Sequence, residues 1–175
     1  MKPDIPHRIG WAIETLGVQG ADSLLEVGCG RGVAIVLIAP KLTNGRILAV
    51  DRSAIAIAAA HQRCAPWENA GKVVFRCAEL GKLTRDAGQF DKIFVINVNL
   101  FWTNPHAELT LIRKLLKPAG KLYLFYEPLA SSQLDRIAGL ISGKFSGSGL
   151  AVKKVVKKDD QAPLLCVICG PGNPV

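Results

Sequence analysis

The sequence predicts an α/β protein built on a mostly parallel β-sheet, and three observations support this class. Short apolar runs of strand length alternate along the chain with segments of helical periodicity. Hydrophobic residues make up 49% of the 175 residues and the mean hydropathy is +0.25, which is typical of a sheet buried on both faces. A glycine-rich turn joins the first apolar run to the helical pattern after it, as is common in parallel α/β sheets.

The individual elements follow one another in the order that such a sheet requires. A first helix is predicted for residues 4–17, because Ile5, Ile9, Ala12, Ile13 and Leu16 share one face. Strands are predicted at residues 23–27, 46–50, 72–77, 90–96, 121–126, 150–156 and 164–169. Further helices are predicted at residues 33–42, 54–64, 105–116 and 131–142, with a short helix or loop at 80–87.

Turn and capping residues separate these elements. Ser53 and Asn104 are predicted N-caps, and Pro66 is predicted to end the helix before it. Residues 117–120, Lys-Pro-Ala-Gly, read as a turn. The connection between the last two strands is short and charged, so we expect a β-hairpin in which the final strand runs antiparallel to the rest.

The stretch from Leu24 to Asp51 carries the strongest functional pattern. Glu26 closely precedes Gly28-Cys29-Gly30-Arg31-Gly32, and Asp51 ends the next predicted strand. The glycines allow a sharp turn and leave no Cβ against a ligand, while the following helix presents free N–H groups. A carboxylate at the end of the second strand can accept hydrogen bonds from both hydroxyls of a ribose. The stretch therefore predicts a nucleotide-type site.

The glycine spacing separates the candidate cofactors. A dinucleotide fingerprint reads G-x-G-x-x-G, but here the third glycine comes one residue early and position 33 is valine. Glu26 would disfavour a pyrophosphate and favour a cofactor with a cationic amino-acid end. The stretch resembles motif I, E/D-x-G-x-G-x-G, of the class I S-adenosylmethionine (SAM) methyltransferases, in which Asp51 matches the ribose-binding acid. The alternative is a glycine turn that only packs a helix on a sheet.

The resemblance extends over roughly residues 20–170. It implies a three-layer sandwich whose seven-stranded sheet has the order 3-2-1-4-5-7-6, with the last strand antiparallel. The segments 73–79, 90–97 and 115–122 resemble the family's motifs at strand three, strand four and the turn before strand five. One departure concerns the adenine loop, where the family often has G-D-A and this chain has Cys77-Ala78-Glu79. The acid comes one position late, so the backbone of Ala78 and Glu79 is the alternative contact.

The resemblance implies SAM as the cofactor and assigns a set of binding residues. They are Glu26, Gly28, Cys29, Gly30, Gly32, Asp51, Arg52, Ala78, Glu79 and Asn97. Asn97 either contacts the reactive end of the cofactor or caps the turn after strand four. Arg31 either binds the cofactor carboxylate or forms a surface ion pair. Phe101 and Trp102 either line a substrate pocket or pack against the next helix.

No catalytic residue can be assigned. The amino-methylating motif N/D-P-P-Y/F is absent after strand four, because Val98 and Asn99 replace the prolines, and the chain has no Pro-Cys dipeptide. His7, His61 and His106 lie in unrelated segments, and no metal site is predicted. Methyl transfer from a sulfonium depends mainly on alignment and exclusion of water, so a missing catalytic group does not weaken the methyltransferase hypothesis. Tyr126 and Glu127, which end strand five, are expected at the rim of the pocket.

Composition bounds the compartment and the partners. Five scattered cysteines favour reduced thiols and a cytoplasmic protein, and Cys166 and Cys169 are expected to be buried strand residues. No apolar run approaches the roughly 20 residues that span a membrane, and the first ten residues contain no signal-peptide core. The net charge is +8, with four lysines in residues 153–158. These lysines either bind an acidic partner such as nucleic acid or, as we favour, solvate an edge strand.

The sequence thus predicts a single SAM-binding domain over residues 1–175, with an N-terminal helical segment at 1–20 and a Rossmann-like core at 21–175. The favoured function is methyl transfer from SAM to a small-molecule acceptor. The alternatives are an RNA or protein methyltransferase that uses the basic surface, and a non-catalytic SAM-fold subunit. An NAD-dependent oxidoreductase is disfavoured by the glycine spacing. A small acceptor would need a pocket completed by residues 1–20, by the loop at 100–104, or by a second subunit of a homodimer.

Overall fold

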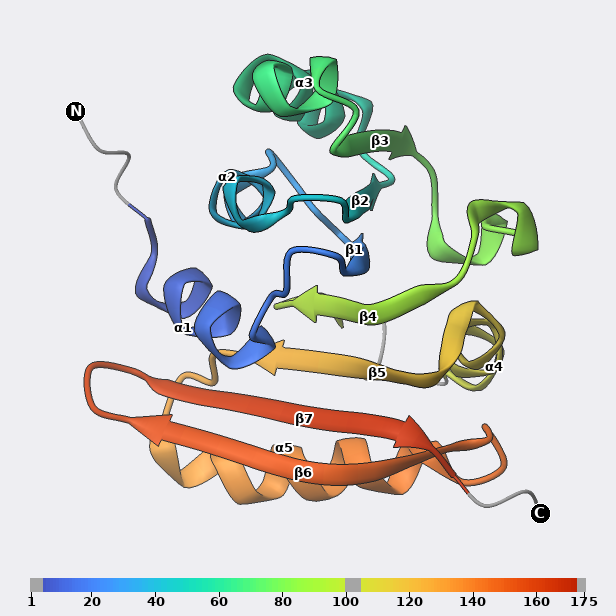
Figure 1. Cartoon of the computed structure of the whole chain (residues 1–175). Helices are drawn as coiled ribbons and strands as arrows, with labels where there is room; N and C mark the ends of the chain where they lie inside the picture. The colour runs from blue at the N-terminus through green and yellow to red at the C-terminus, as the bar shows by residue number, and fades with distance from the viewer. Residues whose placement is uncertain (1–4, 100–104, 173–175) are drawn as a thin grey trace.

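A seven-stranded sheet forms the centre of the molecule (Figure 1). The computed structural model describes residues 5–99 and 105–172. The strands are β1 (Ser23–Val27), β2 (Arg46–Asp51), β3 (Val73–Cys77), β4 (Phe90–Ile96), β5 (Leu116–Tyr126), β6 (Leu150–Asp159) and β7 (Pro163–Pro171). Their order is β3-β2-β1-β4-β5-β7-β6, and only β7 runs antiparallel to its neighbours on both sides. The predicted strand order and the antiparallel final strand are confirmed.

Two layers of helices cover the sheet. The helices are α1 (His7–Leu16), α2 (Val33–Ile38), α3 (Ala54–Asn69), α4 (His106–Leu115) and α5 (Leu134–Ser142). Short 3-10 turns lie at η1 (Ala39–Lys41), η2 (Leu80–Lys82), η3 (Arg85–Ala87), η5 (Ser131–Gln133) and η6 (Gly143–Phe145). None of these described helices is both long enough and apolar enough to cross a membrane.

The core is divided by the sheet into two apolar layers. One layer contains the buried residues of α1, α2 and α3, and the other contains those of α4 and α5. Successive strand residues enter opposite layers, as Leu24 and Leu25 of β1 do, because side chains alternate across a strand. This two-sided burial explains the high hydrophobic content and confirms the three-layer sandwich.

Helix α1 packs on the sheet through the face that its periodicity predicts. Ala12, Ile13 and Leu16 are buried, and the ring of Trp11 meets the ring of Phe125 edge-on at 5.7 Å between centroids. Gly17 ends the helix in the left-handed region, with φ of 57°. The helix therefore belongs to the same apolar layer as α2 and α3.

Helix α3 begins as predicted but ends later. The Ser53 Oγ accepts a hydrogen bond from the Ala56 N–H at 3.2 Å, which confirms the N-cap. The predicted stop at Pro66 is wrong, because the helix continues to Asn69 with Pro66 inside it. A proline removes one backbone donor, but its carbonyl still accepts, here from the Ala70 N–H at 3.2 Å. Trp67 packs against the apolar layer and favours the extra turn.

The predicted turn at residues 117–120 is instead an irregular stretch inside β5. Phe90 of β4 pairs with Leu116 and Lys92 with Lys121, so four residues of β5 face a single residue of β4. Pro118 suits such a bulge because it has no N–H to offer to the sheet. The turn-forming residues therefore bend the strand without ending it.

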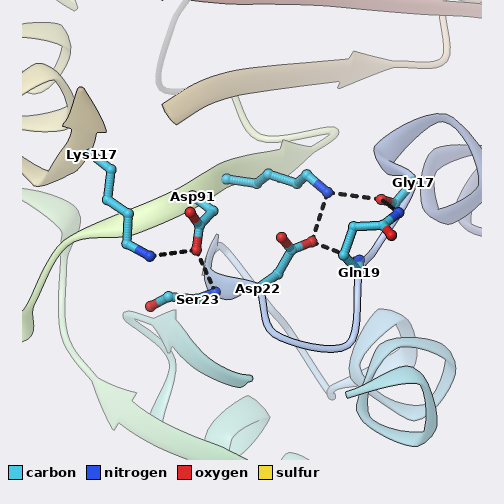
Figure 2. A network of polar contacts seen from close by, with 7 residues as sticks. Gly17, Gln19, Asp22, Ser23, Asp91 and Lys117 are labelled. Carbon is cyan, nitrogen blue, oxygen red and sulfur yellow. Dashed lines mark hydrogen bonds and ion pairs between the residues drawn. The ribbon is translucent and has the colours of Figure 1, made fainter. Parts of the chain in front are cut away.

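The amino ends of the strands are held by two buried or half-buried carboxylates, shown in Figure 2. One is Asp22, whose Oδ2 lies 2.6 Å from the Lys92 Nζ and accepts the Gln19 N–H at 2.7 Å. The Lys92 Nζ also donates to the Gly17 carbonyl at 2.8 Å. This cluster joins the end of α1 to the start of β4.

The second carboxylate is Asp91, which connects β1, β4 and β5. Its Oδ2 accepts the Ser23 N–H at 2.9 Å and the Lys117 Nζ at 2.7 Å. Partial burial opposes ionisation, but the hydrogen bonds from Lys117 and Ser23 outweigh it and lower the pKa of Asp91 below its ordinary value. Both carboxylates lie at the edge of the sheet where β1 and β4 begin, which leaves the opposite edge for a ligand.

Candidate functional site

The carboxyl ends of the parallel strands surround a cavity of about 610 Å³. Its lining comes from the ends of β1, β2 and β4, from the loop after β3 and from α4. The residues are Val27, Gly28, Val50, Asp51, Arg52, Ala78, Glu79, Leu80, Gly81, Ile96, Asn97, Val98, Asn99 and Glu108. Six of the ten predicted cofactor residues therefore meet at one cavity, at the sheet edge where ligands of open α/β sheets bind.

Gly28 is the glycine of the loop that faces this cavity. Its φ is 78°, and a Cβ built on it would lie 2.4 Å from the Val98 Cγ2. The N–H groups of Gly28 and Cys29 both donate to the Val50 carbonyl, at 2.8 and 3.0 Å. The loop is thus fixed against β2, and only a residue without a side chain fits beside Val98.

The other two glycines of the motif lie behind the cavity wall. Gly32 has a φ of 73°, and a Cβ there would meet the Cys64 Sγ at 3.1 Å and the Ala60 Cβ at 3.3 Å. Its role in this structure is close packing of α2 against α3. Gly30 has a φ of 53° with open space around its Cα, and its N–H points to a side chain of β2.

That side chain is Asp51, which links the glycine loop to the cavity. Its Oδ2 accepts the Gly30 N–H at 2.8 Å, and its Oδ1 accepts the Ser53 N–H at 2.9 Å. A carboxylate has about four acceptor positions, so two remain after these bonds. Asp51 lines the cavity and can therefore still accept hydrogen bonds from the two hydroxyls of a ribose.

The predicted adenine loop is only partly available for a ligand. The Ala78 N–H donates to the Asp51 carbonyl at 2.9 Å and is therefore occupied. The carbonyl of Glu79 accepts the Lys82 N–H at 3.0 Å, which begins η2. The sequence proposed the backbone of Ala78 and Glu79 as the adenine contact. Of their two N–H groups, that of Glu79 is the one that makes no backbone hydrogen bond of this kind within the described residues. Arg52 also lines the cavity, directly after Asp51.

Glu26 is the most perturbed acid of the site. It is 3% exposed, its Oε2 has no hydrogen-bond partner among the described residues, and it lies behind the loop without lining the cavity. Burial, and to a smaller extent the charge of Asp51, raises the pKa of Glu26 to about 8. The pKa of the Cys29 thiol is raised too, by burial and then by Glu26 and Asp51, so this cysteine is no nucleophile.

Asn97 has the capping role that the sequence left open, and it also lines the cavity. It has a φ of 52°, and its N–H donates to the Phe125 carbonyl at 2.9 Å. Its side-chain Oδ1 accepts the Glu127 N–H at 2.8 Å, so it caps the exit of β4 onto β5. Asparagine is among the few residues that tolerate a left-handed backbone. With its oxygen bound to the Glu127 N–H, the side chain can offer its NH₂ as a donor to a ligand.

A second cavity of about 310 Å³ adjoins the first. The two cavities share Asn97 and Asn99. The remaining lining residues of the second are Tyr126, Glu127, Pro128, Leu129, Gln133, Arg136 and Ile137. Tyr126 and Glu127 were expected at a pocket rim, whereas Gln133 and Arg136 were missed. No sequence pattern marks these two, because the packing of η5 and α5 on the sheet brings them here.

Several other predicted residues lie away from both cavities. Arg31 is exposed, and its carbonyl accepts a hydrogen bond from Arg63 at 3.3 Å. His61 Nδ1 lies 2.8 Å from Glu68 Oε2 within α3, a pairing that the sequence did not suggest, and its ring meets that of Phe75 edge-on. Phe101 and Trp102 fall outside the described residues. Within the described residues no three His, Cys, Asp or Glu side chains are placed to hold a metal ion.

Comparison with known proteins identifies the family. Residues 24–120 match the methyltransferase domain family. The ubiquinone biosynthesis O-methyltransferase of Pseudomonas aeruginosa is 25% identical over 120 residues, which cover 68% of this chain and 50% of that protein. Magnesium protoporphyrin IX methyltransferase from Synechocystis, solved with bound S-adenosylhomocysteine (SAH), has a TM-score of 0.69 at 15% identity, covering 94% of this chain and 80% of its own. The [4+2]-cyclase SpnF has a TM-score of 0.74 at 14% identity, and the match covers 93% of this chain and 80% of the SpnF chain.

The chain therefore belongs to the methyltransferase domain family and has the fold of the class I SAM methyltransferases, whose cofactor is SAM. It spans 34% of the length of one curated relative and 50% of another, so it corresponds to about a third to a half of those proteins. The site fits this cofactor on structural grounds. Asp51 retains acceptor positions at the cavity, Gly28 lines the same cavity, and Glu26 has a buried side-chain oxygen without a hydrogen-bond partner among the described residues.

Proposed function

We propose that this chain transfers a methyl group from SAM to a small-molecule acceptor. The observation that carries the proposal is the pair of adjoining cavities that share Asn97 and Asn99. The larger has the size and the acid of a cofactor site, and the smaller, of about 310 Å³, has the size of a small-molecule site. A ligand in each would bring the two reacting groups together beside Asn97.

The residues of the larger cavity would hold the cofactor along its length. Asp51 would accept hydrogen bonds from the ribose, and the Glu79 N–H would meet the adenine. Gly28 would border the amino-acid end of the cofactor, with Glu26 on the same side of the cavity. A cationic group near Glu26 would favour its ionised form and so lower its raised pKa.

The chemistry needs position more than it needs a catalytic side chain. Bound SAM supplies a methyl carbon activated by a sulfonium. The chain's contribution is to align an acceptor in the smaller cavity with that carbon and to keep water out of the junction, which can account for much of a rate enhancement. A general base is required only for an acceptor that arrives protonated. Glu108 lines the larger cavity and is the candidate for this base, since its carboxylate forms no ion pair within the described residues.

An oxygen acceptor is the class that the relatives support. The Pseudomonas aeruginosa relative is an O-methyltransferase by name, and a relative from Bacillus cytotoxicus is a malonyl-[acyl-carrier protein] O-methyltransferase. Because this chain spans only part of either protein, the acceptor class is our inference from the likeness. We therefore infer a hydroxyl or carboxyl oxygen as the methyl acceptor.

A methyltransferase of RNA or protein is the less favoured function. Its basis is the run of lysines on β6, but Lys157 pairs with Asp135, and the Lys158 Nζ lies 3.0 Å from Asp160. Half of that positive charge is thus balanced within the fold. A protein without methyltransferase activity is the other alternative, because the cyclase SpnF has the same fold.

Two measurements, made one after the other, test the proposal. Calorimetric titration with SAM and with SAH is expected to show binding of both, and absence of binding would contradict the cofactor assignment. Methyl transfer from labelled SAM is then measured over a panel of small phenols and carboxylic acids and over total RNA. Label transferred to a small acceptor supports the proposal, and label confined to RNA replaces it with the alternative.

A further inference from the structure

The polar groups of the second cavity are unbalanced in charge. Among its lining residues the charged ones are Glu127 and Arg136. The Glu127 Oε2 is already bound by the Arg8 Nη1 at 3.2 Å, an ion pair that brings α1 to the end of β5. Arg136 has no ion-pair partner within the described residues. The cavity therefore presents one uncompensated cation.

Two amide side chains of the cavity are oriented by the fold so that they add donors. The Gln133 Oε1 accepts the Leu129 N–H at 3.2 Å, and the Asn97 Oδ1 accepts the Glu127 N–H at 2.8 Å. These bonds fix the oxygen of each amide on the backbone, and each NH₂ can then donate to a ligand. Two amide donors and a guanidinium together suit a carboxylate or a phosphate.

The apolar residues of the same cavity include a side chain that is left exposed to water. Leu129 is 97% exposed and lines the cavity together with Pro128 and Ile137. A side chain of this size so fully exposed gains by being covered, because apolar surface removed from water is stabilising. A ligand with an apolar body would supply that cover.

We propose that the second cavity binds an amphipathic acceptor, a small molecule with an apolar body and a carboxylate or phosphate group that Arg136 holds. The proposal rests on the proposed function and names its substrate class. Arg136 lines only the second of the two cavities, whereas Asn97 and Asn99 line both. The anionic group is therefore an anchor at the far end, and the acceptor oxygen lies at the junction with the cofactor cavity.

The test compares three probes of similar size: phenylacetate, phenyl phosphate and the neutral 2-phenylethanol. Their affinities are measured by ligand-observed NMR at about 150 mM salt, with the chain saturated by SAH. We expect at least one anionic probe to bind about tenfold more tightly than the alcohol, because a charge-assisted contact with a guanidinium is stronger than a neutral one. The tighter of the two anions identifies the group that the site prefers.

Two variants and a matched control locate this preference. Arg136→Gln is expected to abolish the tenfold preference and to leave binding of 2-phenylethanol and SAH unchanged. Leu129→Ala, at an exposed position, is expected to weaken all three probes severalfold. Arg46→Gln removes the same charge at the amino end of β2, on the opposite edge of the sheet, and is expected to preserve the preference.

Three outcomes would overturn the proposal. The first is a wild-type chain that binds the three probes equally. The second is an Arg136→Gln variant that keeps the preference for the anion. The third is an equal loss of preference in Arg46→Gln and Arg136→Gln, which would show a general effect of net charge. The probe titrations are also repeated without SAH, so that the Arg136 comparison does not depend on cofactor binding. Failure of SAH to bind would contradict the proposed function, and the Arg136 comparison could still be made.

Discussion

The carboxylate of Asp51 accepts the backbone N–H of Gly30 at 2.8 Å, so the acid that ends β2 holds the glycine loop that follows β1. Its other oxygen accepts the Ser53 N–H at 2.9 Å, where α3 begins. One side chain thus fixes two loops and also lines the cofactor cavity. If the larger cavity binds the cofactor as proposed, folding of the loop and cofactor binding depend on the same group.

Replacement of this carboxylate tests both roles at once. We expect Asp51→Ala to weaken SAM and SAH binding by about 10- to 100-fold, because hydrogen bonds to a charged acceptor contribute about 1.5–3 kcal/mol. The free energy of unfolding should fall by about 1–3 kcal/mol, since the half-buried N–H of Gly30 and the exposed N–H of Ser53 both lose their charged acceptor. Calorimetric titration and urea denaturation measure the two effects.

A control separates this result from a general loss of negative charge. Asp135→Ala removes an exposed carboxylate that contacts Lys157 on the surface, and it should leave cofactor affinity unchanged. Asp51→Asn keeps one carbonyl oxygen and should fall between the wild type and Asp51→Ala. Wild-type SAM affinity in Asp51→Ala would show that the ribose does not contact this residue.

The glycine loop offers a comparison of two positions that share a conformation and differ in surroundings. Gly28 and Gly30 both have positive φ, but an added Cβ meets the Val98 Cγ2 at 2.4 Å only at Gly28. Both alanine variants should lose about 1 kcal/mol to the left-handed backbone. Gly28→Ala should lose about 1–3 kcal/mol more, because valine has a stiff side chain that cannot turn away. Urea denaturation of both variants measures the difference.

The double variant Gly28→Ala/Val98→Ala isolates the steric part of this loss. Removal of the Val98 methyl groups should restore most of the difference between the two single variants, while the backbone cost remains. Equal losses in Gly28→Ala and Gly30→Ala would contradict a close approach of Val98 to the loop.

The sequence predicted the parts of this molecule that depend on local chemistry. The order of the glycines and the acids Glu26 and Asp51 indicated a cofactor site, because turn, helix start and strand end are each encoded within a few residues. Ser53 was found as an N-cap for the same reason. The strand order came from the family resemblance and not from the residues alone.

Features that depend on distant partners were not predicted. The bend within β5 at 117–120 could not be told from a turn, because its outcome depends on pairing with β4. The pair between Arg8 and Glu127 joins residues 119 positions apart. Gln133 and Arg136 carry no motif, and their place beside Asn97 follows from how α5 packs. The sequence therefore indicated the smaller cavity only through Asn97, Tyr126 and Glu127, whereas it indicated most of the acids and glycines around the larger one.

The raised pKa of Glu26 predicts a pH-dependent contribution to stability. With its pKa raised from about 4.5 to about 8, Glu26 keeps its proton in the folded chain at pH values where the unfolded chain has lost it. The contribution is therefore fully present below about pH 4.5 and is lost as pH rises toward 8, with a slope of at most about 1.4 kcal/mol per pH unit. Glu26→Gln cannot ionise and should gain stability relative to the wild type across this range.

Urea denaturation of both proteins at intervals from pH 5.5 to 8.5 measures this difference. The advantage of Glu26→Gln should be smallest at pH 5.5 and largest at pH 8.5. Other groups titrate equally in both proteins and cancel in the comparison. Parallel stability curves would show that Glu26 ionises with an ordinary pKa.

The two carboxylates at the amino edge of the sheet predict unequal effects on stability (Figure 2). The ion pair of Asp22 with Lys92 is largely buried, with side chains 11% and 15% exposed, whereas the pair of Asp91 with Lys117 is 34% and 41% exposed. Asp22→Ala should cost about 3 kcal/mol, because it leaves a buried ammonium with one carbonyl partner. Lys117→Ala should cost less than about 1 kcal/mol. Urea denaturation of both variants measures the contrast.

The position of this network adds a second condition to the same prediction. Because Asp22 and Lys117 lie at the opposite edge of the sheet from the cavities, both variants should bind SAH with wild-type affinity at temperatures where they are folded. The double variant Asp22→Ala/Lys92→Met should recover part of the stability, since it removes the unpaired charge and keeps an apolar stem. A loss of SAH affinity in a fully folded Asp22→Ala variant would show that the two edges are coupled through β1. Equal losses of unfolding free energy in Asp22→Ala and Lys117→Ala would show that burial does not determine the strength of these ion pairs.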